Sequence, residues 1–329
     1  MGWSSYPPEH KRSFFSAVAL YAVIVAAGAG WIWLRSGVAL DAWKDRVPHA
    51  AADIRTVYVS PQTAGASKLF TGDSALPPPG AGEGYISIIM TDIGMSDHAT
   101  ERALDDLPPP VVLAFSPYAR KLEKWLKKAT DAKRESLILL PMEPTTYPKD
   151  DPGPDALLSR LSDKENGARL DRVLQKSEGT LGAMNFMGSG FLADDRNTRP
   201  VFDTLRHRGA LFVEEPLVAG EPASADTAKA AELSYVSADM RIDANATELA
   251  VKKQLLDLES LARKRGYAVG IAQPYPVTFN ILKDWAETLD RRGIKLVPLT
   301  DVLKTKVQHD KAAATEQQQE QQKTPPPQQ

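Results

Sequence analysis

The residues of this sequence best suited to chemistry are polar side chains that stand directly after short apolar runs. The clearest is Asp92, in the stretch ISIIMTDIG from Ile86 to Gly94. Its isoleucines and methionine predict a buried strand, because such side chains pack well in a sheet. Parallel α/β folds place their reactive groups at the carboxyl ends of strands, so Asp92 is a candidate catalytic residue. The alternative is that Asp92 only caps a loop.

Similar polar residues follow the later apolar runs. In a barrel of parallel strands the carboxyl ends meet on one face, so these side chains and Asp92 are predicted to line one cleft. Each of them alone is more simply explained as a loop-capping residue, and their repetition at successive strand ends favours a shared site. The candidate substrate-binding residues are Ser116, Glu143, Asn185, Ser189, Glu214, Asp243 and Gln273.

Apolar runs alternate with helical patterns between residues 85 and 307, and several of the helical patterns end at glycine. Roughly seven to eight βα units of this kind predict an α/β fold closed into a (β/α) barrel, with an open doubly wound sheet as the alternative. The predicted strands are Ile86–Thr91, Val111–Phe115, Leu137–Leu140, Leu181–Phe186, Ala210–Glu214, Leu233–Val236, Val269–Ala272 and Lys295–Pro298.

The stretch Phe14–Leu34 carries no charge and, as a helix of roughly 31 Å, matches a bilayer core. Lys11 and Arg12 precede it, which places residues 1–13 in the cytoplasm and the rest of the chain across the membrane. An uncleaved transmembrane signal anchor and a signal peptide cut after Ala29 are both compatible with this pattern. The apolar run continues beyond Ala29 as far as Leu34, which favours the anchor.

Two further segments lack the pattern of a packed domain. Residues 35–84 mix small, charged and proline residues without sustained periodicity, which predicts a flexible stalk between membrane and barrel. Residues 308–329 are rich in glutamine, glutamate and proline, and they carry too little apolar surface to offset chain entropy, which predicts disorder. The barrel is therefore expected to span residues 85–307.

Composition narrows the possible cofactors and partners. The net charge of −2 argues against nucleic-acid binding. The chain has no cysteine, which excludes disulfides, thiolate metal sites and cysteine nucleophiles.

Of five histidines, only His98 and His207 lie in the predicted barrel, and both are expected at solvated helix positions. A zinc site needs about three protein ligands, so no metal ligand is assigned and no cofactor is expected. The alternative is an all-oxygen site for Mg²⁺ or Ca²⁺ formed by Asp92, Glu143, Glu214 and Asp243.

Five strings occur in a fixed order, namely TDIGMSDHATERAL, LAFSPYA, LILLPMEPTTYPKDDPGP, NFMGSGF and IAQPYP. In this order they resemble the divergent polysaccharide deacetylase family, a branch of the polysaccharide deacetylase superfamily. The resemblance covers about Tyr85 to Leu303. It implies an irregular (β/α) barrel, a periplasmic location in Gram-negative bacteria and a role in carbohydrate metabolism.

The resemblance also implies a divalent metal, held by an acid and two histidines, which activates water beside an acidic general base. Asp92 matches the position of that base. The expected metal ligands and neighbouring residues are replaced here, which implies a degenerate metal site. The replacing residues are Ile93 for the second acid, Phe186 and Gln273 for histidines, and Glu214 and Glu215 for an acid and a serine.

Two hypotheses on function follow. The first is a membrane-anchored periplasmic carbohydrate deacetylase, or related hydrolase, with an altered site. The second is a non-catalytic pseudoenzyme that binds envelope glycan or a protein partner. An envelope glycan or other carbohydrate is the expected ligand, and the sequence identifies no protein partner. Both hypotheses place the N-terminal helix in the cytoplasmic membrane.

Overall fold

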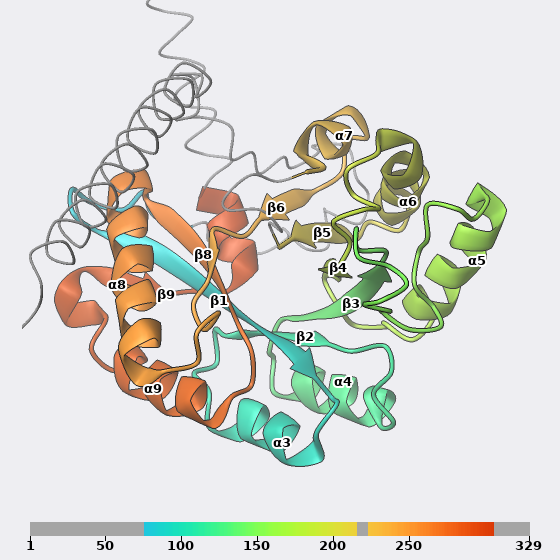
Figure 1. Cartoon of the computed structure of the whole chain (residues 1–329). Coiled ribbons are helices and arrows are strands. Elements are labelled where there is room, and N and C mark those ends of the chain that lie inside the picture. Colours follow the sequence, from blue (N-terminus) through green and yellow to red (C-terminus); the bar gives the residue numbers. More distant parts are fainter. Residues whose placement is uncertain (1–75, 216–222, 306–329) are drawn as a thin grey trace, which may run out of the picture. The chain divides into compact units, whose positions relative to one another are not determined.

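The computed structural model describes residues 76–215 and 223–305, and within them nine strands form one sheet (Figure 1). Its order is β6-β5-β4-β3-β2-β1-β8-β7, and β9 also pairs with β1. The paired strands run parallel, with helices packed outside them. The described part is therefore an α/β, barrel-like fold, which confirms the predicted class.

The strands are β1 (Gly84–Ile93), β2 (Val112–Phe115), β3 (Ser136–Met142), β4 (Gly182–Met187), β5 (Leu211–Glu214), β6 (Tyr235–Ser237), β7 (Met240–Arg241), β8 (Tyr267–Ala272) and β9 (Ile294–Leu296). The helices are α3 (Asp97–Asp105), α4 (Leu122–Asp131), α5 (Asp163–Leu174), α6 (Asp195–His207), α7 (Ala225–Ala230), α8 (Glu248–Arg265), α9 (Pro276–Ala286) and the 3₁₀ helix η2 (Asp290–Arg292). Residues 299–305 are also helical. All eight predicted strands are present, whereas α7 and β7 lack a sequence pattern long enough to predict them.

One short segment links the two ends of the strand order. The Ala238 amide donates to Glu214 O at the end of β5, and the next amide, of Asp239, donates to Val269 O of β8, both at 2.8 Å. Strand β6 pairs with β5, and β7, the next strand along the chain, pairs with β8. This crossing gives the sheet its barrel-like form in place of the open doubly wound alternative.

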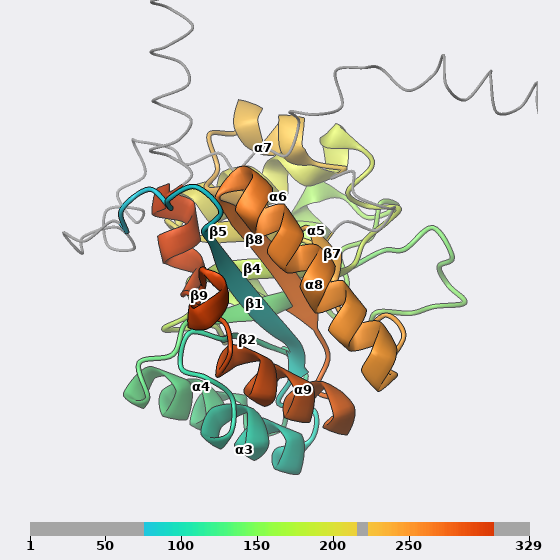
Figure 2. The ribbon, with the colours of Figure 1, turned by 90° about the vertical axis from the view of Figure 1, so that its left-hand side faces the viewer.

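Alternation along the strands creates two separate cores. In β1, Ile86, Ile88 and Met90 belong to the apolar layer between strands and helices, whereas Tyr85 and Ile89 belong to the cluster inside the barrel. Successive side chains of a strand point to opposite faces, so each strand contributes to both layers. Helix α8 covers β1 and β8 on the outside (Figure 2).

The interior cluster is completed at the amino ends of the strands. Val297, which follows β9, and Leu299, Val302 and Leu303 of the C-terminal helical segment belong to it. The Glu135 carboxylate accepts the Leu299 amide at 2.7 Å and thereby holds this segment against the start of β3.

The tryptophans of α4 and α9 are packed in the outer layer, as their helical spacing indicates. Trp125 is fully buried, and Trp285 donates its indole N–H to the Glu259 carboxylate at 2.8 Å. Glu259 is buried as well and pairs with Arg292 at 2.8 Å and Arg263 at 3.1 Å. This ion-pair network joins α8, α9 and η2.

Residues 76–83 lead into β1 and contact the barrel. Leu76 packs against the interior cluster, and the Tyr85 hydroxyl donates to Pro77 O at 2.7 Å. The expected cytoplasmic segment 1–13, the predicted anchor Phe14–Leu34, residues 35–75 of the predicted stalk and the tail 308–329 lie outside the described residues. No helix within the described ranges is long and apolar enough to cross a membrane.

Candidate functional site

Asp92 lies at an irregularity near the end of β1. Met90 pairs with Leu113 and Ile93 with Phe115, so two residues of β1 stand opposite one residue of β2. Such a bulge redirects the side chains of its strand and is common beside active sites. The backbone of Asp92 is left-handed, with φ of 58°, a conformation that aspartate adopts more readily than most residues.

Gly94 completes this turn, because its φ of 95° and its packing both require glycine. A Cβ at Gly94 would lie 2.6 Å from the Cβ of Ala119. The following helix α3 begins as predicted, since the Ser96 hydroxyl accepts the Ala99 amide.

A chain of hydrogen bonds holds the Asp92 carboxylate. The Tyr275 hydroxyl donates to Gln273 Oε1 at 2.6 Å, and Gln273 Nε2 donates to Asp92 Oδ2 at 2.9 Å. The Thr91 hydroxyl donates to the same Oδ2 at 3.1 Å. Oδ1 of Asp92 has no hydrogen-bond partner among the described residues, so it remains available as an acceptor for a ligand.

Asp92 and Gln273 line an open hollow of about 450 Å³ between the β1–α3 turn and the start of α9. Met95 and Tyr275 also line it, with 62% and 39% of their surface exposed. His98 belongs to the same lining, although its sequence position indicated only a solvated helix residue. The hollow combines a carboxylate, an amide, an imidazole and an aromatic ring.

A second charged group lies beside this hollow. Arg241 of β7 holds Glu215 with two hydrogen bonds of 2.7 Å, from Nε and Nη2. Asp243 accepts the Gln273 amide at 2.7 Å and the Thr278 hydroxyl at 2.9 Å through Oδ2. Asp243 is thus a support for the β8–α9 turn that carries Gln273, with 2% of its surface exposed.

Both carboxylic acids of this group favour the protonated form more than usual. Burial raises the pKa of Glu215, Arg241 opposes that shift, and the nearby charges of Asp92 and Asp243 add to it. Burial likewise raises the pKa of Asp243, against the hydrogen bonds from Gln273 and Thr278. Low-dielectric surroundings penalise the charged form of each acid.

The raised pKa of Asp243 predicts a pH-dependent stability. The folded state keeps this proton at pH values where the unfolded state releases it, so stability falls as pH rises from 3.8 through the raised pKa. Asp243→Asn removes this titration. The melting temperature of the native chain relative to the variant is expected to be highest at acid pH and to decline toward neutrality. The exposed Asp257→Asn serves as control, and a difference that grows with pH would contradict the prediction.

The remaining candidate residues mostly hold loops. Asn185 accepts the Glu215 amide at 2.7 Å and donates to Met187 O at 2.9 Å, which joins the ends of β4 and β5. Ser116 accepts the Tyr118 amide through its hydroxyl at 3.3 Å. Ser116 follows β2 and Asn185 lies within β4, and neither residue lines the hollow.

Glu143 and Ser189 stand together at the ends of β3 and β4. The Glu143 carboxylate accepts the Ser159 amide, and its backbone carbonyl accepts the amide of Gly190 at 3.0 Å. The Ser189 hydroxyl accepts the Thr145 amide at 3.0 Å. Of the eight candidate residues, only Asp92 and Gln273 line the hollow, so the prediction of one cleft for all of them is too broad.

Glu214 is the clear correction. It is fully buried and accepts the Tyr235 hydroxyl at 2.7 Å and the Ala223 amide at 2.6 Å. Phe212, two residues earlier, belongs to the outer layer, so Glu214 points outward too, and Glu215 is the acid beside the hollow. The alternation of Phe212 with the inward Val213 was the signal in the sequence that would have separated the two glutamates.

The residues present do not fit a deacetylase-type metal site. Asp92 Oδ2 is occupied by Gln273 and Thr91, and Ile93 is packed in the outer core with 1% exposure. Phe186 packs against the interior cluster. Within the part of the chain that the structure describes, no three histidine or acidic side chains are grouped to hold an ion.

Fold and hollow define the chain as an α/β barrel-like protein with a carboxylate–amide site at the carboxyl ends of β1 and β8. The profile of the divergent polysaccharide deacetylase family matches residues 88–303, and the chain belongs to this family.

Three proteins with similar sequence or structure carry no described function. The chain is 30% identical to the solved structure of ATU2773 from Agrobacterium tumefaciens C58, with a TM-score of 0.66 over 76% of this chain and 100% of that one. It is 23% identical to YibQ of Escherichia coli K12 over 209 residues, and the match covers 63% of each chain. A Haemophilus influenzae protein is 24% identical over 199 residues, which are 60% of this chain and 69% of that one.

Proposed function

We propose that this chain is a membrane-anchored periplasmic protein that binds envelope glycan in the hollow beside Asp92. The observation that carries the proposal is the Asp92 carboxylate, which Gln273 and Thr91 hold through Oδ2 while Oδ1 is left for a ligand. A carboxylate accepts hydrogen bonds from sugar hydroxyl and acetamido groups. The exposed ring of Tyr275 adds an apolar face.

Family membership supports carbohydrate as the ligand class, and the residues support binding over catalysis. Without a metal, the attacking water keeps a high pKa and the developing oxyanion lacks a Lewis acid. A positioned general base alone contributes only about 10²–10⁴-fold. The second candidate function is a slow hydrolase in which Asp92 orients water, favoured by the position of Asp92 at the bulge.

The test uses the full chain in nanodiscs of zwitterionic lipid and a chito-oligosaccharide as probe. Saturable binding by calorimetry is expected, without acetate release and without stoichiometric zinc in elemental analysis. One equivalent of zinc together with acetate release would show a metal-dependent deacetylase and overturn the binding role. Absence of both binding and acetate release would refute the glycan proposal.

The membrane part of the proposal rests on the uncharged stretch Phe14–Leu34 behind Lys11 and Arg12. A reporter enzyme that is active only in the periplasm is expected to be active when it is fused to the C-terminus. Activity of a strictly cytoplasmic reporter at that position would contradict the topology.

A further inference from the structure

The charge of the Asp92 carboxylate is not neutralised by a cation of the chain. Asp92 forms no ion pair within the described residues, and the two groups that hold its Oδ2, the Gln273 amide and the Thr91 hydroxyl, are uncharged. Its Oδ1 is unpaired, and the residue lines the hollow. A ligand that enters the hollow therefore meets an uncompensated negative charge.

The basic side chains of the lining do not offset this charge. Arg102 lines the hollow, but its Nε lies 3.1 Å from Asp106 Oδ2, and its guanidinium lies over the ring of Phe279, at 4.6 Å from the ring centroid. His98 is the other basic residue of the lining, and a neutral imidazole adds no charge. Arg102 is thus matched by an acid of its own.

The charges behind the hollow add to the negative potential. Arg241 is matched by Glu215, which it holds with two hydrogen bonds of 2.7 Å. Asp243 lies behind Gln273 and accepts only uncharged donors, an amide and a hydroxyl, through Oδ2. Its Oδ1 has no hydrogen-bond partner in the part of the chain described here. The surroundings of Asp92 therefore favour a cationic ligand over a neutral or anionic one.

An ammonium group has the chemistry that this end of the hollow requires. It carries three donors and no acceptor. Two acceptors are available to it, namely Asp92 Oδ1 and the Tyr275 hydroxyl oxygen, whose own proton is donated to Gln273. The half-exposed ring of Tyr275 adds a face on which a cation can lie. A neutral acetamido group gains less from the same carboxylate, because hydrogen bonds with two charged partners are stronger.

We propose that the glycan bound in this hollow carries free amino groups, as a de-N-acetylated amino sugar does. The inference rests on the glycan-binding role proposed above and adds the class of sugar to it. The ammonium group of one sugar donates to Asp92 Oδ1, and the ring of that sugar lies beside Tyr275. Hydrolytic removal of acetyl groups from a glycan is the class of reaction that supplies such a ligand.

Calorimetric titration with two oligosaccharides of equal length tests the inference. One is an oligomer of glucosamine and the other an oligomer of N-acetylglucosamine. The full chain in zwitterionic nanodiscs is titrated at a pH at which most amino groups of the first oligomer are protonated. The glucosamine oligomer is expected to bind about tenfold more tightly, the difference between a charge-assisted and a neutral hydrogen bond.

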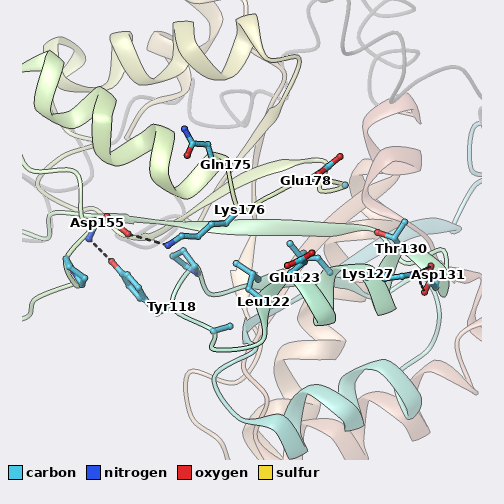
Figure 3. A pocket seen from close by; sticks show the side chains of 15 residues that line it. Tyr118, Leu122, Glu123, Lys127, Thr130, Asp131, Asp155, Gln175, Lys176 and Glu178 are labelled. Atoms are coloured by element: carbon cyan, nitrogen blue, oxygen red, sulfur yellow. Dashed lines mark hydrogen bonds and ion pairs between the residues drawn. The ribbon is translucent and has the colours of Figure 1, made fainter.

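Two variants test whether the preference comes from this carboxylate. Asp92→Asn is expected to reduce the ratio of the two affinities to about one, because the charge that distinguishes the two oligomers is removed. Glu178→Gln is the control. Glu178 is exposed and lines a separate groove of about 990 Å³ between α4 and the end of α5, which shares no lining residue with the hollow (Figure 3). This variant removes the same charge and should leave the ratio unchanged.

The possible failures are distinguishable. Equal affinities for the two oligomers, or tighter binding of the N-acetylated one, would overturn the inference and leave the glycan-binding role standing. No binding of either oligomer would refute that role and the inference with it. A preference that persists in Asp92→Asn would place the amino group elsewhere. Loss of the preference in Glu178→Gln as well would show a general charge effect and overturn the assignment to the hollow.

Discussion

Trp125→Ala is expected to lower the free energy of unfolding of the barrel by about 4 kcal/mol, the typical cost of deleting a buried tryptophan. Trp125 is fully buried in the layer between strands and helices. Its outer side is covered by the ammonium groups of Lys124 and Lys128, at 4.9 and 5.2 Å from the ring centroid. Alanine therefore leaves a cavity that neighbouring side chains fill only partly. Thermal unfolding should show a fall in melting temperature of roughly 10 °C.

Two matched variants separate this cavity effect from other causes. Trp125→Phe keeps much of the aromatic volume and removes an indole N–H that has no hydrogen-bond partner within the described residues, so its cost is expected to be clearly smaller. Leu249→Ala on α8 removes a side chain that is 82% exposed and should change stability by less than about 0.5 kcal/mol. Equal melting temperatures for Trp125→Ala and Leu249→Ala would contradict the packing described for α4.

Asp92→Asn is expected to weaken binding of a chito-oligosaccharide about tenfold to hundredfold, the range for losing a hydrogen bond to a charged group. Asparagine adopts the left-handed backbone of this position as readily as aspartate, so the bulge is retained. Its amide oxygen can still accept from Gln273 Nε2. Its amide nitrogen, however, replaces the free carboxylate oxygen with a donor and removes the charge. Calorimetric titration of both proteins measures the difference.

Asp97→Asn is the control for this change. Asp97 lies five residues further along, on α3, and pairs with Lys121 at 2.5 Å outside the hollow. Its replacement is expected to leave glycan binding unchanged. Equal affinities of the native chain and Asp92→Asn would show that the glycan is held elsewhere. An equal loss in both variants would point to a general charge effect instead.

Much of the fold follows from local patterns. The isoleucines of β1 and the tryptophans of α4 and α9 lie in the core as their spacing indicates. Ser96 begins α3, and Gly266 ends α8 with φ of 87°. These features depend on residues within one or two turns of each other, so the sequence is enough to predict them. The shortest elements, β7 and α7, contain too few residues to form a pattern.

The candidate site depends on contacts between segments that are distant in the chain. Asp92 and Gln273 were both predicted at strand ends, yet their contact joins residues 181 positions apart in the chain. The family motif alone places Glu214 in the site, whereas strand alternation predicts that its side chain points away from the site. In the structure, Glu214 accepts a hydrogen bond from the Tyr235 hydroxyl. The sequence does not predict His98 and Tyr275 as site residues, because only the packing of the β1–α3 turn beside α9 brings them to the hollow.

By itself, then, the sequence determined where the longer strands and helices lie, which of their faces are buried and which family the chain resembles. Only the tertiary structure decided where the acids point. The bulge that redirects Asp92 arises from the pairing of β1 with β2. The barrel-like closure arises because β6 pairs with β5 while β7 pairs with β8. Periodicity reports the neighbours of a residue along the chain. Register, bulges and closure depend on partners that are distant in sequence, so no local pattern encodes them.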